Sequence, residues 1–99
     1  MSMQAWIFLY GTKGVTPRIM TKVMEKLIGK IQKSNYGQYE YEVKGILPKG
    51  DYIRPVRAVL IVKKEYLQEV VNLFELYKIR YRIFEIKLDI DDFQKSQFL

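Results

Sequence analysis

Apolar and polar positions along the chain fall into six segments whose spacing predicts strands and helices in the order β-α-β-β-α-β. Two near-continuous apolar runs, residues 4–10 and 56–62, are typical of strands covered on both faces. Strict alternation over Tyr39–Val43 predicts a half-exposed strand. A last strand is predicted over residues 79–90, where the apolar phase switches between Ile83 and Phe84 and so indicates a bulge or sharp bend.

Two amphipathic helices are predicted between these strands. The first begins near Pro17, because Thr16 is a good N-cap and proline fits the first helical position. It is expected to run to about Ser34, where Asn35 and Gly37 stop it. The second helix covers residues 64–78. The apolar stripe of each helix follows helical spacing: Met20, Val23, Met24, Leu27, Ile28 and Ile31 in the first, and Leu67, Val70, Val71, Phe74 and Tyr77 in the second.

The predicted order is that of the split βαβ, ferredoxin-like arrangement, a two-layer α+β sandwich. In that arrangement the first and third strands are central, and here these are the two continuous apolar runs. A turn is expected over residues 47–51, where Pro48 and Gly50 interrupt the pattern. The length of 99 residues fits one domain, residues 1–99, with a short polar tail at about 91–99. The topology stays open at this point.

Composition restricts the chemistry that the chain can carry out. Cys and His are both absent, which excludes an imidazole base, a thiolate nucleophile, a disulfide and the usual zinc sites. Asp89, Asp91 and Asp92 carry oxygen ligands of the kind Mg²⁺ prefers, but we expect them to end the last strand and solubilise the tail. We therefore expect no enzymatic activity, no catalytic residue, no metal and no cofactor.

The best candidate site is a row of basic residues on the first predicted helix. Four of them are spaced four apart and a fifth follows three later: Arg18, Lys22, Lys26, Lys30 and Lys33. At about 100° per residue they span roughly 120° of the helix, nearly opposite its apolar stripe. With 17 basic against 11 acidic residues and a net charge of +6, this row predicts contact with the phosphates of DNA, or with an acidic protein surface. The other interpretation is a solvated helix face of the Lys- and Glu-rich kind typical of hyperthermophiles.

Four more basic residues follow in the segment 44–57, opposed by Asp51 alone: Lys44, Lys49, Arg54 and Arg57. They would enlarge the positive surface if this segment lies beside the first helix. The sequence does not decide whether it does, because the answer depends on the topology.

The first strand carries the second candidate surface. Alternation places two sets of side chains on opposite faces: Trp6, Phe8 and Tyr10 on one, Ala5, Ile7 and Leu9 on the other. Either set could face the helices. If the aliphatic set does, the aromatic set covers the open sheet, where an apolar patch usually meets a partner. We therefore predict a homodimer with Trp6, Phe8 and Tyr10 in its interface, and a homodimeric interaction module without a nucleic-acid role is the alternative function. Burial of the aromatic set in the core and stacking of bases on it stay open as well.

Two short runs of this chain resemble a known group of proteins. They are Ala5-Trp-Ile-Phe-Leu-Tyr-Gly-Thr-Lys-Gly14 and Lys44-Gly-Ile-Leu-Pro-Lys-Gly50. Together with the Ile-, Lys- and Tyr-rich composition, they resemble small uncharacterised proteins of the filamentous and rod-shaped viruses of hyperthermophilic archaea, the lipothrixviruses and rudiviruses. The resemblance extends over the whole chain and implies a thermostable viral accessory protein. It brings no assigned activity and no catalytic motif, so no functional residue carries over.

Targeting signals are not visible in the sequence. The first residues, Met1 to Gln4, lack a basic region of the kind that opens a signal peptide. Uncharged apolar stretches are far shorter than the ~20 residues that span a bilayer, so we expect no membrane span. The expected location is inside the host cell, in its cytoplasm, with association with the virion left open.

Overall fold

In its described residues the chain is an α+β protein with one four-stranded sheet, one two-stranded sheet and two α-helices. The computed structural model describes residues 2–34, 37 and 39–94, and of residues 31–34, 90 and 94 it describes the backbone only. In chain order the elements are β1 (Ser2–Tyr10), α1 (Pro17–Ile28), β2 (Lys30–Ser34), β3 (Tyr39–Val43), β4 (Tyr52–Ile53), β5 (Val59–Lys63), the 3₁₀ turn Lys64–Tyr66, α2 (Leu67–Leu76), β6 (Tyr81–Asp89) and the 3₁₀ turn Ile90–Gln94.

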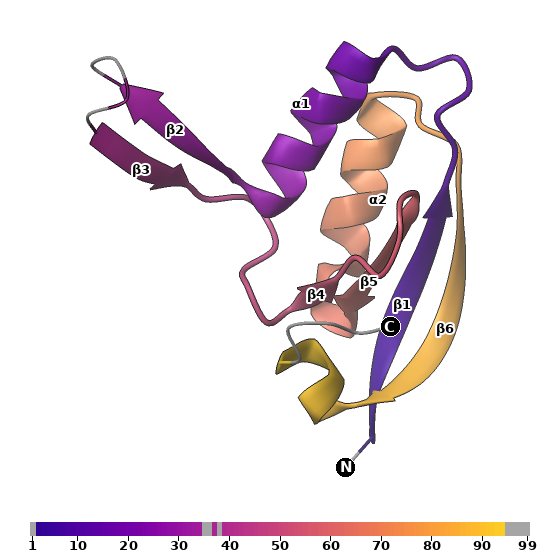
Figure 1. Cartoon of the computed structure of the whole chain (residues 1–99). Helices are drawn as coiled ribbons and strands as arrows, with labels where there is room; N and C mark the ends of the chain where they lie inside the picture. Colours follow the sequence, from indigo (N-terminus) through magenta and orange to yellow (C-terminus); the bar gives the residue numbers. More distant parts are fainter. Residues whose placement is uncertain (1, 35–36, 38, 95–99) are drawn as a thin grey trace.

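The larger sheet has the order β4-β5-β1-β6, and every neighbouring pair is antiparallel. The two apolar runs provide its central strands β1 and β5, as their pattern predicts. Both helices pack on one face of this sheet (Figure 1), because Val23 and Leu27 of α1 and Val70 and Phe74 of α2 share a core with Phe8 of β1. The ring of Phe8 meets that of Phe74 edge-on, with centroids 5.7 Å apart.

Helix α1 begins where the sequence predicts and ends six residues earlier than expected. The Thr16 side chain accepts a hydrogen bond from the Ile19 N–H, 3.2 Å away, and Pro17 takes the first helical position. Gly29 ends the helix with a φ of +81°, a conformation that favours glycine. A Cβ atom on Gly29 would also collide with the carbonyl oxygen of Val43. The chain therefore turns at Gly29, and Lys30–Ser34 is a strand rather than the last part of a helix.

Strands β2 and β3 form a hairpin that projects from the rest of the molecule (Figure 1). The alternating pattern of Tyr39–Val43 correctly predicts a strand, but this strand is exposed on both faces and not half-exposed, and it does not lie in the main sheet as the ferredoxin-like arrangement predicts. The strand at the edge of the main sheet next to β5 is β4, where Tyr52 pairs with Val62 and Ile53 with Ile61 of β5. Alternation indicates that one face is polar, and it does not indicate which strand is the neighbour.

Of the bulge or sharp bend predicted between Ile83 and Phe84, the bulge is wrong. The β1–β6 register is continuous from Ser2↔Asp89 to Tyr10↔Tyr81. The phase of the apolar residues switches because the buried face changes along the strand. Ile83 packs toward the helices, whereas Ile86 and Leu88 pack on the opposite face.

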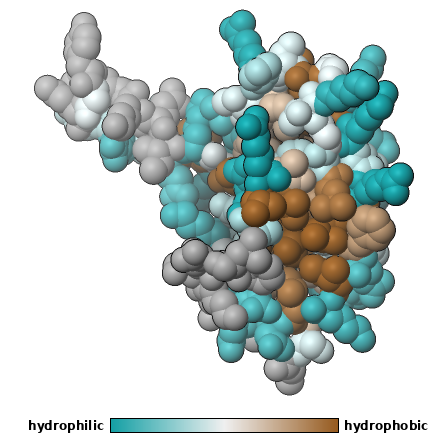
Figure 2. Space-filling model, turned by 45° about the vertical axis from the view of Figure 1, so that its right-hand side comes forward, coloured by the Kyte–Doolittle hydropathy of each residue, from teal (hydrophilic) through white to brown (hydrophobic). Residues whose placement is uncertain are grey.

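Among the residues that the structure describes, those that cover this opposite face of the sheet lie at one of its ends. Phe93 of the last 3₁₀ turn packs there on Ala5, Ile53 and Ile61. At the other end Leu9 and Phe84 keep 41% and 49% of their surface exposed. Figure 2 shows the resulting hydrophobic patch on the side of the molecule formed by β1 and β6.

The aromatic set of β1 faces the helices, so the core interpretation of this row is the one that the structure supports. Phe8 is fully buried and Tyr10 is 7% exposed, and Trp6 packs partly against the same core. Phe8 and Tyr10 are thus occupied within one chain. The expectation that Trp6, Phe8 and Tyr10 cover the open face as a dimer interface is wrong, because the aliphatic set takes that face.

Candidate nucleic-acid interface

Helix α1 presents its cations on the side opposite its buried residues. Val23 and Leu27 are fully buried against the sheet and α2. Arg18, Lys22 and Lys26 are exposed. The four-residue spacing therefore places these three side chains along one outer surface, as the sequence predicts.

The remaining two residues of the predicted row lie beyond the helix. Lys30 is the first residue of β2, and its ammonium group pairs with Glu25 of α1 at 3.3 Å. This ion pair keeps Lys30 beside the last turn of the helix. Lys33 lies in β2 on the projecting hairpin, and its side chain is outside the described part of the structure. The prediction that all five cations lie on one helical face is therefore wrong for Lys30 and Lys33, which follow the end of α1.

A different lysine joins the helix in place of Lys33. The chain leaving β3 is fastened to the end of α1, because the Ile46 N–H donates to the Lys26 carbonyl at 2.9 Å and the Leu47 N–H to the Leu27 carbonyl at 2.7 Å. These bonds satisfy carbonyls that a helix end leaves free. They also hold Lys44 next to α1.

Four lysines consequently line one hollow of about 650 Å³: Lys22, Lys26, Lys30 and Lys44. We call it the lysine hollow. Glu25 also lines the lysine hollow, and its carboxylate is paired with the ammonium group of Lys30. Within the described residues, Lys22, Lys26 and Lys44 have no carboxylate within 4.0 Å. The Lys26 ammonium lies 5.8 Å above the Tyr77 ring, a cation–π contact that leaves its hydrogen-bond donors free.

Charge is distributed unevenly over the molecule. Up to Arg57 the sequence holds ten basic and four acidic residues, and after Arg57 it holds seven of each. The whole net charge of +6 therefore belongs to the part of the chain that contains α1, the hairpin and the lysine hollow. A positive potential concentrated on one side attracts polyanions to that side.

The other basic residues of the segment 44–57 do not join the lysine hollow. Lys49 lines a separate depression with Glu40, Tyr41 and Glu42 of β3. Arg54 and Arg57 lie across α1 from the lysines, over a cavity described below. The positions of these basic residues relative to α1 could not be predicted from the sequence. Gly45 is the residue that could have indicated the approach of this segment to α1, because a Cβ atom there would collide with the backbone of Leu27 and Gly29.

One hydrogen bond links two of the aspartates near the C-terminus. The Asp92 carboxylate accepts a hydrogen bond from the Asp89 N–H at 3.1 Å. In the residues that the structure describes, no three Asp or Glu side chains come together as a metal ion would require. Nor does any helix in the same part of the chain have the length and apolar character needed to cross a membrane.

Comparisons of this chain with known protein families, with curated proteins and with solved structures gave no match. The fold and the site thus define the chain only as an α+β protein with a cationic surface on α1.

Proposed function

We propose that this protein binds nucleic acid without sequence preference through the lysine hollow and Arg18. The observation that carries the proposal is the set of four ammonium groups around one hollow, where the one acidic residue among the described lining, Glu25, is already paired with Lys30. Phosphates that displace counterions from such a surface gain free energy from their release. Ammonium groups read charge and not base edges, so the binding should be independent of sequence. This is the role we propose for a viral accessory protein of the kind that the sequence resembles.

We also infer that the main sheet is a variant of the ferredoxin-like two-layer sandwich. Strands β5 and β6 are both antiparallel to β1, which lies between them, and α2 connects them. This is a split βαβ unit. In this interpretation β4 takes the place of the second strand, and the hairpin of β2 and β3 is an insertion between α1 and β4.

The test is a salt titration of binding to a labelled duplex. Each phosphate contact should contribute about −0.9 to the slope of log K against log salt, so four to five contacts predict roughly −3 to −5. Replacing Lys22, Lys26 and Lys44 by Glu should abolish binding at ~50 mM salt. The matched control replaces Lys64, Arg80 and Lys87 by Glu, which changes the net charge equally at exposed positions elsewhere.

Two results would contradict the proposal. One is a native protein that does not bind the duplex at ~50 mM salt, where a non-specific cationic site should still be occupied. The other is an equal loss of affinity in both triple variants, because net charge alone would then account for the binding.

A second function, self-association without a nucleic-acid role, is favoured by the apolar patch on the open sheet face. We propose a second copy of this chain as its partner. Leu9 of β1 and Phe84 of β6 lie on this face together with Ile7, which is directly opposite Phe84 in the register of the two strands. Such a surface is complementary to itself, and a twofold pairing is the commonest closed arrangement.

A further inference from the structure

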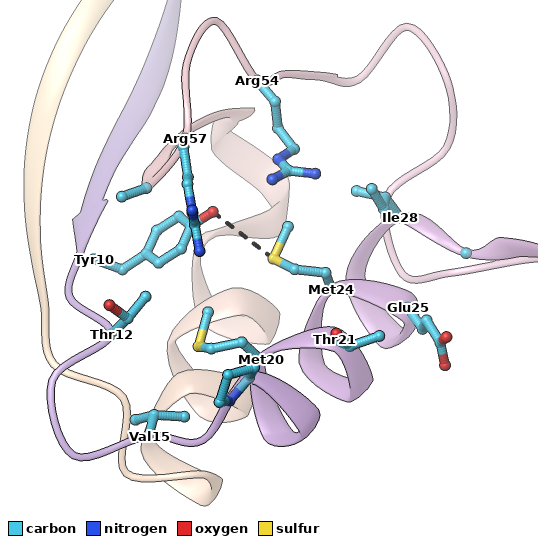
Figure 3. A pocket seen from close by; sticks show the side chains of 13 residues that line it. Tyr10, Thr12, Val15, Met20, Thr21, Met24, Glu25, Ile28, Arg54 and Arg57 are labelled. Atoms are coloured by element: carbon cyan, nitrogen blue, oxygen red, sulfur yellow. Dashed lines mark hydrogen bonds between the residues drawn. The ribbon is translucent and has the colours of Figure 1, made fainter.

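A second cavity lies on the flank of α1 that faces away from the lysine hollow (Figure 3). It has a volume of about 470 Å³ and is formed by the end of β1, the exposed turns of α1 and the segment 54–58 before β5. Its floor is apolar, because Met20, Met24 and Ile28 project into it from α1. This size is within the range of small-molecule sites, about 300–1,000 Å³.

Two arginines reach over this apolar floor. In Figure 3 the side chains of Arg54 and Arg57 extend from the segment before β5 toward Met24 and the Tyr10 hydroxyl. Neither has a carboxylate partner in the described part of the chain. The acidic residue on the rim, Glu25, is paired with Lys30 on the other side of the helix. Two guanidinium groups therefore face one cavity with their donors unused, a geometry suited to carboxylate or phosphate oxygens.

The Tyr10 hydroxyl is a third polar group that faces this cavity. Its residue is 7% exposed, and the hydroxyl donates to the sulfur of Met24 at 3.8 Å. A thioether is a weak hydrogen-bond acceptor. An oxygen of a bound ligand would be a better acceptor at the same place.

The backbone at the cavity wall is strained. Ala58 has a φ of +69°, in the left-handed region that residues with a Cβ atom rarely adopt. The Tyr10 N–H holds it there by donating to the Ala58 carbonyl at 3.1 Å. Strain of this kind persists where the surrounding structure enforces it, frequently at binding sites. Here the hydrogen bond from Tyr10 fixes the turn that carries Arg57 over the cavity.

We propose that this cavity binds a small organic anion: Arg54 and Arg57 hold its carboxylate or phosphate, and its apolar body lies on Met20 and Met24. Methionine side chains adapt to ligands of different shapes, which suits such a floor. The proposal concerns other side chains than the lysine hollow does, so it stands independently of nucleic-acid binding.

The experiment uses anilinonaphthalene sulfonate as the probe, an aromatic anion that fluoresces when its ring leaves water. We expect saturable binding of one probe per chain, weakened at least about tenfold in the double variant Arg54→Gln plus Arg57→Gln, because charge-assisted hydrogen bonds are lost. Thr21→Trp, which fills the cavity from an exposed position of α1, should weaken binding with both arginines in place. Thermal denaturation of each variant checks that it is folded.

The matched control is Arg82→Gln, because Arg82 lies opposite Leu9 next to the other apolar surface of the molecule. Probe binding that is lost in Arg82→Gln, or unchanged in the double arginine variant, would overturn the proposal by placing the probe elsewhere. Adenosine monophosphate and octanoate then compete with the probe. Displacement by the first identifies a nucleotide-like anion, and displacement by the second an aliphatic carboxylate. Displacement by neither at millimolar concentration would overturn the proposed ligand class.

Discussion

Asp51 illustrates how a single side chain fastens two parts of this fold. Its carboxylate accepts a hydrogen bond from the Tyr66 hydroxyl at 2.7 Å and pairs with the Lys63 ammonium at 2.9 Å. The hydrogen bonds from Lys63 and Tyr66 lower the pKa of Asp51, and the hydrogen bond to Asp51 raises the pKa of Tyr66 to about 12. The turn before β4 is thereby tied to the end of β5.

These pKa shifts predict a pH dependence of stability at both extremes. The pKa of Asp51 is lowered on folding, so its contribution is present above the ordinary value of 3.8 and is lost as the pH falls through the lower folded value. The pKa of Tyr66 is raised, so its contribution is present below 10.0 and is lost as the pH rises toward about 12.

The expected result is that Tyr66→Phe flattens the alkaline decline in the free energy of unfolding. The measurement is urea denaturation at several pH values between about 8 and 12. The exposed Tyr39→Phe is the matched control, and it should keep the native decline. An identical alkaline decline in Tyr66→Phe and native protein would contradict the prediction.

The backbone conformation of Lys78 predicts that a glycine there would stabilise the protein. Lys78 follows α2 with a φ of +57°, and the Ile79 N–H donates to the Phe74 carbonyl at 2.8 Å in a Schellman-type helix end. A residue with a Cβ atom costs roughly 1 kcal/mol or more in this conformation. Lys78→Gly should therefore raise the free energy of unfolding by about 1 kcal/mol, as measured by chemical denaturation.

Lys64→Gly is the control for that substitution, because Lys64 lies in a 3₁₀ turn and not in the left-handed region. It should leave stability unchanged or lower it. A loss of stability in Lys78→Gly comparable to that in the control would show that the backbone conformation of Lys78 carries no cost.

At the scale of elements, a close contact between Gly29 and Gly45 determines how the segment after the hairpin packs against the end of α1. Gly29 and Gly45 approach so closely that a Cβ atom on either would collide with the backbone of the other segment. This contact lets the amides of Ile46 and Leu47 reach the last carbonyls of α1. The position of Lys44 beside the helix depends on it.

Gly45→Ala should therefore destabilise the protein by about 1–3 kcal/mol, since overpacking forces the backbone apart. Hydrogen exchange at the Ile46 and Leu47 amides should become faster. Gly11→Ala is the control, because nothing lies within 4 Å of a Cβ atom there and its φ is not in the left-handed region. Unchanged exchange at both amides in Gly45→Ala would contradict the role given to this contact.

The same contact shows what could be predicted from the sequence. The start of α1 and the two central strands follow from capping residues and apolar runs, which are local signals. The end of α1 does not, because Ile31 continues the helical stripe while Gly29 turns the chain for a tertiary reason. For the candidate site, Arg18, Lys22 and Lys26 follow from helical spacing. Lys44 is distant in sequence and joins them only through the hydrogen bonds of Ile46 and Leu47.

At the scale of the whole molecule, the cationic surface and the apolar patch lie on different sides of the fold. Helix α1 covers one face of the sheet, and Leu9 and Phe84 belong to the opposite face. A second copy bound to the patch would leave both lysine hollows exposed. Self-association and nucleic-acid binding are therefore compatible, and a dimer would present two cationic surfaces to one polyanion.

The last prediction concerns this self-association. Phe93 already covers one end of the open face, which leaves less apolar surface for a second copy to bury. Specific stable interfaces bury about 1,200–2,000 Å² in total, and a surface below that range forms weak complexes. We therefore expect light scattering at ~100 µM to give a mass between monomer and dimer that falls on dilution. Leu9→Glu plus Phe84→Lys should give a monomer at every concentration.

Leu76→Glu is the matched control, because Leu76 is 71% exposed on α2, away from the sheet face. The self-association should persist in this variant and should hold or strengthen as salt rises, since an apolar contact is not screened. A native mass that stays monomeric at ~100 µM would exclude this dimer. A native mass increase that Leu76→Glu abolishes would move the contact to α2, and one that salt abolishes would assign it to charged side chains instead of Leu9 and Phe84.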